Sequence, residues 1–363
     1  MRIKINLLLT LLPALFSAAY SQTTVSGIID RDTRWNAENG PFIIEGDILV
    51  TRRANLVIAP GTEIIIADSE KNESPAKPFD KADSALISIR VQGALTVVGK
   101  RDKPVTFKPQ TAGLASYGWR GIIIDEAKNG YVEIAFAEIS GATTGITVKK
   151  TNALLRNNII ENCNIGIHCF FGGTSNIYNN LITSCFTSAI KIERSNPQIL
   201  NNIIAFNKNT GLWCDNTSKV RFRYNCVFGN IDGNFLDCDP ETGRLSKVNK
   251  NNDSTDAADN IIKDPVFIGS AAQARAIALD VNTPTDSSKV KNPALLKILN
   301  IVNPQTASSG EDEPQTIKGV KNHYKLSKYS PCFNAGDPAK RFNNSDGKRN
   351  TIGPEGGPEF MGD

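Results

Sequence analysis

The sequence predicts an all-β fold, a right-handed parallel β-helix whose rungs are about 21–23 residues long. Three observations predict it: a repeated phrase, an alternation of apolar and variable residues within the phrase, and an asparagine at one fixed place in each repeat. The phrase reads NNIIENCNIGIHC from Asn157, NNLITSCFTSAIKI from Asn179 and NNIIAFNKNTGLWC from Asn201. Units this short cannot bury an apolar face alone, whereas stacked units share one core.

Each unit contains two short alternating runs with polar residues between them. The second run reads GITVK, GIHCF, AIKIE and GLWCD in successive units. Alternation with period two is typical of strands, and helical repeats need at least about 33 residues. The pattern also extends backwards, because Ile139 lies 21 residues before Ile160. We therefore expect at least five such rungs over roughly residues 131–238.

The recurring asparagines lie 22 residues apart, with a last interval of 23. Stacked at one corner, their amides are expected to hydrogen bond between rungs about 4.8 Å apart. Asparagine also tolerates the left-handed backbone that a tight corner needs. We predict a structural ladder formed by Asn158, Asn180, Asn202 and Asn225.

The remaining segments are assigned in chain order. In residues 1–21, Arg2 and Lys4 precede an apolar run and the small residues of SAAYSQ, which is the layout of a secretory signal peptide. We expect a secreted or cell-surface protein. Residues 22–268 are assigned to the β-helix, with an N-terminal cap at 23–47 and a loop at 69–84. An insertion with a short helix and a linker is expected at 269–320, and a closing segment packed on the solenoid at 321–363.

The bulk composition excludes several classes of protein. A net charge of +4 is too weak to indicate nucleic-acid binding, which needs clustered basic residues. The apolar run at 7–16 is shorter than the roughly 20 residues of a membrane-spanning helix, and we expect no later segment to be apolar enough to span a bilayer. Seven cysteines are an odd number, so at least one has no partner within the chain. Cys163 and Cys185 occupy equivalent places on successive rungs.

We expect the protein to be a monomer.

The order GALTVVGKRDKPVTFKP, YGWRGIIID and NNII-type rungs resembles secreted bacterial right-handed β-helix repeat proteins of the pectin-lyase-like superfamily. The ending, with HYKLSKYSPCFNAGDP and DGKRNTIGPEGGP, is similar to the closing segment of many such chains. Asn334 and Thr351 stand where that segment is usually acidic, which weakens a calcium site at Asp337 and Asp346. The paired-Asp, Gly-His-Gly and Arg-Ile-Lys strings of the pectate-lyase and polygalacturonase branches are missing. The resemblance therefore implies the fold and leaves the activity open.

Superposing the rungs predicts two outward-facing columns of side chains on one face of the helix. Residues that alternate with them, such as Ile167 and Cys169, should point inward. The first column is predicted to contain Thr147, His168, Lys191, Trp213 and Phe235, and the second Lys149, Phe170, Glu193, Asp215 and Asp237. This face brings titratable and aromatic side chains together, so it is the predicted functional site.

The columns allow several kinds of chemistry on an acidic polysaccharide. We predict substrate binding by Trp213, Phe170, Phe235 and Asp237, and catalysis by Lys191, Glu193, Asp215 and His168. Carboxylates on adjacent rungs would have the ~5 Å spacing of retaining glycosidases, and Glu193 and Asp237 the ~9 Å of inverting ones. Alternatively, Lys191 abstracts a proton beside a uronate carboxylate with His168 assisting, as in a lyase, if its pKa is lowered.

Two further interpretations remain at this point. A carboxylate column could hold Ca²⁺, which takes six to eight oxygen ligands; otherwise we expect no metal or cofactor. The columns could also be the solvated face of a non-catalytic structural or adhesive solenoid with a protein or envelope partner. The other histidine, His323, is expected at the surface.

Overall fold

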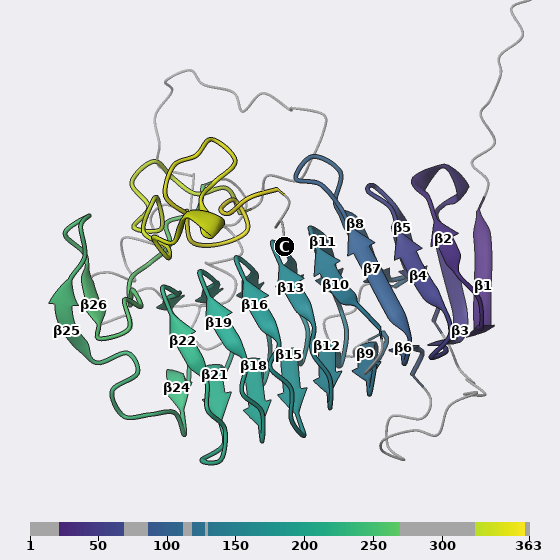
Figure 1. Ribbon diagram of the computed structural model, residues 1–363, viewed down its shortest axis with the longest axis horizontal. Helices are drawn as coiled ribbons and strands as arrows, with labels where there is room; N and C mark the ends of the chain where they lie inside the picture. The colour runs from purple at the N-terminus through teal and green to yellow at the C-terminus, as the bar shows by residue number, and fades with distance from the viewer. Residues whose placement is uncertain (1–21, 69–85, 112–117, 128–129, 269–323, 360–363) are drawn as a thin grey trace, which may run out of the picture.

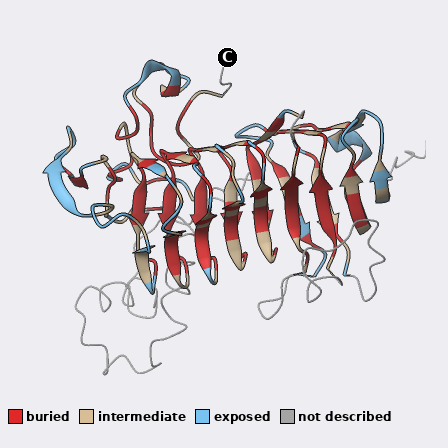
Figure 2. Ribbon diagram, turned by 60° about the horizontal axis from the view of Figure 1, so that its bottom comes forward, coloured by how far each residue is buried: buried red, intermediate tan, exposed pale blue. Residues whose placement is uncertain are grey.

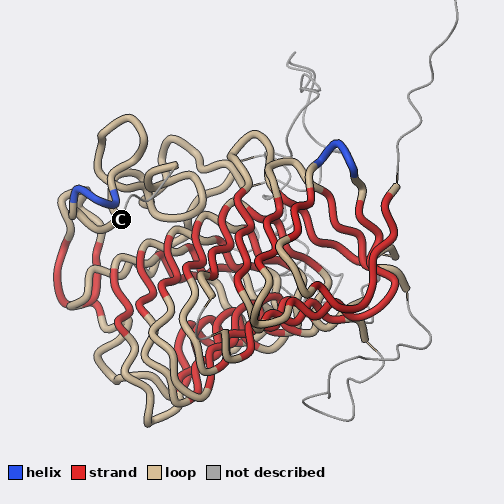
Figure 3. The backbone as a smooth tube through the Cα atoms, turned by 45° about the vertical axis from the view of Figure 1, so that its right-hand side comes forward, coloured by secondary structure: helices blue, strands red, loops and turns tan. Residues whose placement is uncertain are grey.

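The computed structural model describes residues 22–68, 86–111, 118–127, 130–268 and 324–359. The chain winds into a parallel β-helix with three faces, in which each rung contributes one strand to each face (Figures 1 and 3). The prediction of a parallel β-helix is thus confirmed. The predicted signal peptide at 1–21, the loop at 69–84 and the insertion at 269–320 lie outside the described residues.

The first face carries the longest strands of the regular rungs. It begins at β3 (Phe42–Val50), on which β1 (Thr23–Ile29) also pairs, and runs in parallel register to the last rung. Its further strands are β6 (Ser88–Val91), β9 (Gly121–Asp125), β12 (Thr144–Lys149), β15 (Ile165–Phe170), β18 (Ser188–Glu193), β21 (Thr210–Cys214) and β24 (Gly233–Leu236).

The other two faces consist of shorter strands. The second face contains β2 (Thr33–Trp35), β4 (Asn55–Ile58), β7 (Ala94–Val98), β10 (Val132–Ala135), β13 (Leu154–Arg156), β16 (Asn176–Tyr178), β19 (Gln198–Leu200) and β22 (Arg221–Arg223). The third face starts at the first half of β3 and contains β5 (Glu63–Ile66), β8 (Val105–Pro109), β11 (Ala137–Ser140), β14 (Ile159–Glu161), β17 (Leu181–Thr183), β20 (Ile203–Ala205) and β23 (Cys226–Phe228).

Three small elements complete the described structure. An antiparallel hairpin of β25 (Leu245–Val248) and β26 (Ser254–Asp256) follows the last rung. Two 3₁₀ turns, η1 (Ala37–Asn39) and η5 (Lys340–Phe342), lie near the two ends of the described chain.

The core is a stack of aliphatic side chains that repeat from rung to rung. On the first face, the inward positions Ile122, Ile146, Ile167, Ile190 and Leu212 are in register and buried. Figure 2 shows the strands mainly as buried and the turns as exposed. Each such side chain contributes about 1.5–3 kcal/mol by burial. At the N-terminal end, Trp35 stacks on Phe42 with ring centroids 4.9 Å apart.

A ladder of buried asparagine amides joins the rungs at the corner between the second and third faces. Each Nδ2 donates to the next Oδ1: Asn158 to Asn180 at 3.0 Å, Asn180 to Asn202 at 2.9 Å, and Asn202 to Asn225 at 3.0 Å. The ladder continues beyond the regular repeats, because Asn225 donates to Asn260 at 3.1 Å. Asn260 in turn donates to Asp256 Oδ2 at 2.9 Å, so a carboxylate ends the ladder.

The first asparagine of each doublet has a different role. Asn157, Asn179 and Asn201 have left-handed φ values of 55°, 55° and 61° and are buried. They hydrogen bond to residues 324–359, which we call the C-terminal segment (yellow in Figure 1). The contacts are Asn157 Nδ2 to Gly356 O at 2.7 Å, Asn179 Nδ2 to Thr351 O at 3.0 Å, and Asp337 N to Asn201 Oδ1 at 2.7 Å. The repeat therefore docks the C-terminal segment along the corner of the helix.

Candidate functional site

The outward side chains of the first face form the strongest candidate site. Parallel pairing places Thr147 beside His168, His168 beside Lys191, and Lys191 beside Trp213. The second column has Lys149 beside Phe170 and Phe170 beside Glu193. We call the following residues the polar strip: Lys149, His168, Phe170, Lys191, Glu193, Trp213 and Asp237.

The predicted position of Phe235 was wrong. Trp213 pairs with Leu236, and Phe235 pairs with the inward residue Leu212. The ring of Phe235 is half-buried against the core and meets Phe222 edge-on, with centroids 5.8 Å apart. The error arises because the last regular rung is 23 residues long, so that an interval of 22 shifts the alternation by one residue.

The centre of the polar strip is a cluster of three titratable side chains. His168 Nε2 lies 2.5 Å from Glu193 Oε2, and Lys191 Nζ lies 3.3 Å from the same oxygen. The imidazole also stacks on Phe170, with centroids 4.7 Å apart and planes inclined by 16°. The three groups come from two adjacent rungs, β15 and β18, so their spacing follows from the parallel register.

Burial sets the protonation of His168. Desolvation lowers the pKa of His168, and the nearby Lys191 ammonium lowers it further, while the bond to Glu193 opposes both effects. The imidazole is therefore neutral at pH 7. Since Glu193 accepts a hydrogen bond, Nε2 carries the proton and Nδ1 has the free lone pair. A neutral imidazole whose orientation is fixed by a carboxylate can act as a general base.

The lowered pKa of His168 predicts a loss of stability on acidification. In the unfolded chain this group takes up a proton near its ordinary pKa of about 6.5, whereas the folded protein takes it up only at lower pH. The contribution of His168 to the free energy of unfolding should therefore be constant above pH ~6.5. It should fall as the pH drops from there towards the pKa of the folded protein. The pKa of His168 in the folded protein can be measured by NMR titration of a His323→Gln variant, in which His168 is the remaining histidine. A midpoint at or above pH ~6.5 would contradict the prediction.

The side chain of Lys191 contacts two neighbours. Besides Glu193, its ammonium lies 4.9 Å from the centroid of the Trp213 ring, close enough for a cation–π contact. Trp213 Nε1 donates to Asp237 Oδ2 at 2.9 Å, which fixes the indole on the last rung. These contacts place the Lys191 side chain where it can bind an anionic group.

Asp215 is occupied at a turn. It accepts hydrogen bonds from Arg194 N at 2.8 Å, from Thr217 N and Oγ1 at 3.2 and 3.0 Å, and from Ser218 Oγ at 2.6 Å. Although desolvation raises the pKa of Asp215, these bonds outweigh it and hold the pKa below its usual value. The group is thus an ionised turn residue, which is poorly suited to donate a proton to a leaving group.

The polar strip extends one rung further than the sequence analysis foresaw. Asp125 at the end of β9 pairs with Lys149, and Lys149 Nζ lies 3.2 Å from Asp125 Oδ1. Asp125 is buried. The aligned run GIIID before GITVK carried the signal for this pair, because Asp125 and Lys149 hold the same place in successive units.

No group of three or more His, Cys, Asp or Glu side chains in the described part of the chain is arranged to hold a metal ion. Within the same residues, no helix is long and apolar enough to cross a membrane.

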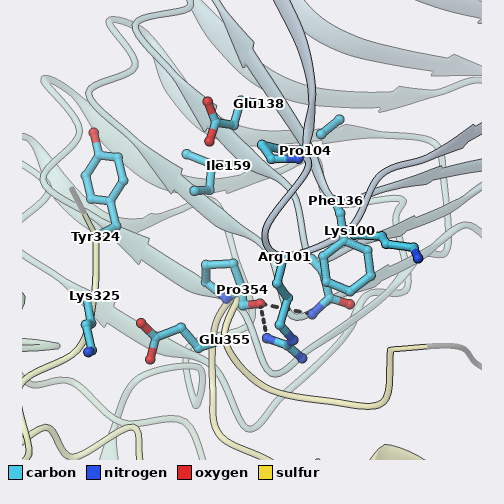
Figure 4. Close-up of a pocket in the computed structure, with 12 residues that line it drawn as sticks. Lys100, Arg101, Pro104, Phe136, Glu138, Ile159, Tyr324, Lys325, Pro354 and Glu355 are labelled. Carbon is cyan, nitrogen blue, oxygen red and sulfur yellow. Dashed lines mark hydrogen bonds between the residues drawn. The ribbon is translucent and has the colours of Figure 1, made fainter. Parts of the chain in front are cut away.

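A separate cavity lies on the third face, under the C-terminal segment. It has a volume of about 380 Å³ and is lined by Arg101, Glu138, Tyr324, Lys325 and Glu355, among others (Figure 4). Arg101 donates to the carbonyls of Pro354, Gly356 and Gly357, so its charge holds the segment. Tyr324 is hydrogen-bonded to Glu161, and burial raises the pKa of Glu355. These polar groups mainly join the segment to the helix.

The fold is that of a β-helix built from repeated rungs. Residues 114–239, which include β12, β15, β18 and β21, match the sequence model of the family described as "Right handed beta helix region". No curated protein matches the chain.

Two crystal structures of mutants of the periplasmic alginate epimerase AlgG are similar to this chain. The single mutant is 14% identical, with 58% of this chain and 62% of that chain covered and a TM-score of 0.32. The double mutant is 13% identical, with 63% and 65% covered and a TM-score of 0.27. The chain thus spans less than two thirds of the length of these proteins.

Proposed function

We propose that this protein binds an acidic polysaccharide along the polar strip and cleaves it by β-elimination, as a polysaccharide lyase. The observation that carries the proposal is the contact of Glu193 with both His168 and Lys191. It puts a neutral base and a cation side by side on an extended face. Export, expected from the signal-peptide pattern of residues 1–21, would bring the protein to such polymers.

The three groups divide the chemistry between them. Lys191 binds the carboxylate of a uronate residue and stabilises the negative charge that develops on it when the adjacent C5 proton is removed. His168 Nδ1 accepts that proton, and Glu193 holds the imidazole through Nε2. The electrons of the C5–H bond form the C4–C5 double bond, and the glycosidic oxygen leaves C4 and takes up a proton. This assignment exchanges the roles that the sequence suggested for Lys191 and His168.

Aromatic rings on both sides of the cluster favour sugar binding. Phe170 lies beside His168, and Trp213 lies one rung beyond Lys191. Successive rungs are about 4.8 Å apart, close to the length of one sugar unit, so neighbouring residues of a chain would meet neighbouring rungs. A glycosidase is less well supported, because Glu193 contacts two cationic or donor groups and Asp215 is bound in a turn.

A non-catalytic structural or adhesive solenoid is the second candidate. One observation favours it: charges on the strip pair with opposite charges, as in Lys149 with Asp125 and Lys191 with Glu193. Mutual pairing of this kind also stabilises an ordinary solvated face. The two candidates differ in whether the protein turns over a polymer.

A screen against acidic and neutral polysaccharides tests the proposed function. With acidic polymers only, we expect a rise in absorbance at about 235 nm, where unsaturated uronates absorb. The number of reducing ends should rise in parallel. Lys191→Ala should lower kcat/KM at least about 100-fold, since it removes a charge that stabilises the transition state. Lys219→Ala, which removes an exposed lysine outside the strip, is the matched control. Binding without turnover would favour the adhesive solenoid, and reducing ends without the absorbance would indicate a hydrolase.

A further inference from the structure

The C-terminal end of the β-helix contains two pairs of contacting cysteines. All seven cysteines are present as thiols. Cys226 in β23 and Cys332 in the C-terminal segment lie together in one buried apolar cluster, with their thiol groups close enough to interact. Cys214 at the end of β21 and Cys238 just after β24 form a second such pair.

The pair Cys226–Cys332 joins two parts of the chain that are 106 residues apart. Both residues are fully buried, in an apolar cluster that contains Ile203 and Leu181 from the β-helix and Ile352 from the C-terminal segment. The backbone around them is fixed as well. Ile352 N donates to Cys332 O at 2.9 Å, and Cys226 Sγ donates to Lys263 O at 3.1 Å. The two thiols are therefore neighbours in the apolar interface between the segment and the helix.

We propose that Cys226 and Cys332 are a cross-linking site, and that oxidation by a low-molecular-weight disulfide ties the C-terminal segment covalently to the β-helix. Without the bond, the segment is held by hydrogen bonds to side chains such as Asn157, Asn179 and Arg101. A bond between residues so far apart in sequence removes much conformational entropy from the unfolded chain, and this effect grows with loop length. The inference is independent of the proposed function.

The exchange reaction balances with oxidised glutathione as the oxidant. The Cys332 sulfur attacks one sulfur of glutathione disulfide, forms a mixed disulfide and releases one reduced glutathione. The Cys226 sulfur then attacks the Cys332 sulfur and releases the second. Two electrons pass from the cysteines to glutathione, and the two thiol protons end on the two glutathione thiols.

Oxidation should occur during folding more readily than afterwards. The adjacent Cys332 thiol and burial hold the pKa of the Cys226 thiol well above its usual value, which keeps it unreactive in the folded state. Cys238, in contrast, is only half-buried, and its bond from Cys214 lowers its pKa. The pair Cys214–Cys238 is therefore the internal reference for oxidation of the folded protein.

A peptide map of the full chain refolded with oxidised and reduced glutathione tests the proposal. After the remaining thiols are alkylated and the chain is digested, mass spectrometry should find a peptide in which Cys226 is linked to Cys332, lighter by two hydrogen atoms than its reduced halves. Alkylation of both residues, or a link of either one to another cysteine, would overturn the proposal. This measurement needs no variant.

Thermal unfolding provides a second measurement. The refolded protein should unfold several degrees higher without reductant than with it, at the order of 5 °C. Cys332→Ser should reduce this difference to what the pair Cys214–Cys238 contributes, and Cys169→Ser should keep it in full, because Cys169 is equally buried but outside both pairs. An equal difference in the Cys332→Ser variant would contradict the assignment. If that variant does not fold, the peptide map decides.

Discussion

Replacing His168 by glutamine is expected to lower the turnover of an acidic polysaccharide by about 10²–10⁴-fold, the usual contribution of a positioned general base. Glutamine keeps an amide donor near Glu193 but has no lone pair that can take up a proton. Affinity for the polymer should change by only a few-fold, since Lys191 and Trp213 remain. The measurement is kcat and KM from initial rates at 235 nm, as in the polysaccharide screen.

The control for this prediction is the same change at the other histidine. His323→Gln should have the activity of the parent protein. A loss confined to KM in His168→Gln would make His168 a binding residue and not the base. Full activity in that variant would remove the polar strip as the catalytic site.

Replacing Asn180 by alanine is expected to lower the free energy of unfolding by about 3–5 kcal/mol. Its Nδ2 donates to Leu155 O and Asn202 Oδ1, and its Oδ1 accepts from the backbone N and the side-chain Nδ2 of Asn158. All these groups are buried, and each polar group left without a partner costs about 1–3 kcal/mol. Equilibrium unfolding in urea measures the loss.

Asn152→Ala is the matched control, because Asn152 also bridges two rungs but is exposed. Its Oδ1 accepts from Thr174 N at 2.7 Å. Water can replace this bond, so the expected loss is at most about 1 kcal/mol. Equal losses at the two positions would show that burial of the ladder does not determine its contribution.

The rung interval made most of the fold predictable. Counting 21–23 residues placed Thr147, His168, Lys191 and Trp213 side by side, as parallel pairing has them. The same counting failed where the interval changes. Phe235 was shifted by one position, and Asn260 was missed because it lies 35 residues after Asn225. A repeat thus predicts register only while its length is constant.

The chemistry within the site was less predictable than its place. Alignment puts Lys191 directly beside His168, yet Glu193 from the other column is the group that contacts both. Side-chain rotamers decide such diagonal contacts, and the alternation pattern contains no information about them. The bonds of Asn179 to Thr351 were equally hidden, since the partners lie 172 residues apart and the segment that contains Thr351 has no repeat.

The asparagine doublets also constrain the number of units between residues 157 and 201. Solenoids commonly gain or lose whole units, because each unit contacts only its neighbours. Here the asparagines at 157, 179 and 201 hydrogen bond at three points to the C-terminal segment, which has no repeat. Adding a unit between them would move two of these contacts apart by about 4.8 Å, and removing one would bring them closer by the same distance, while the bound stretch kept its length. The C-terminal segment therefore fits a fixed number of units, and the gain or loss of a unit beneath it would break its contacts with the β-helix.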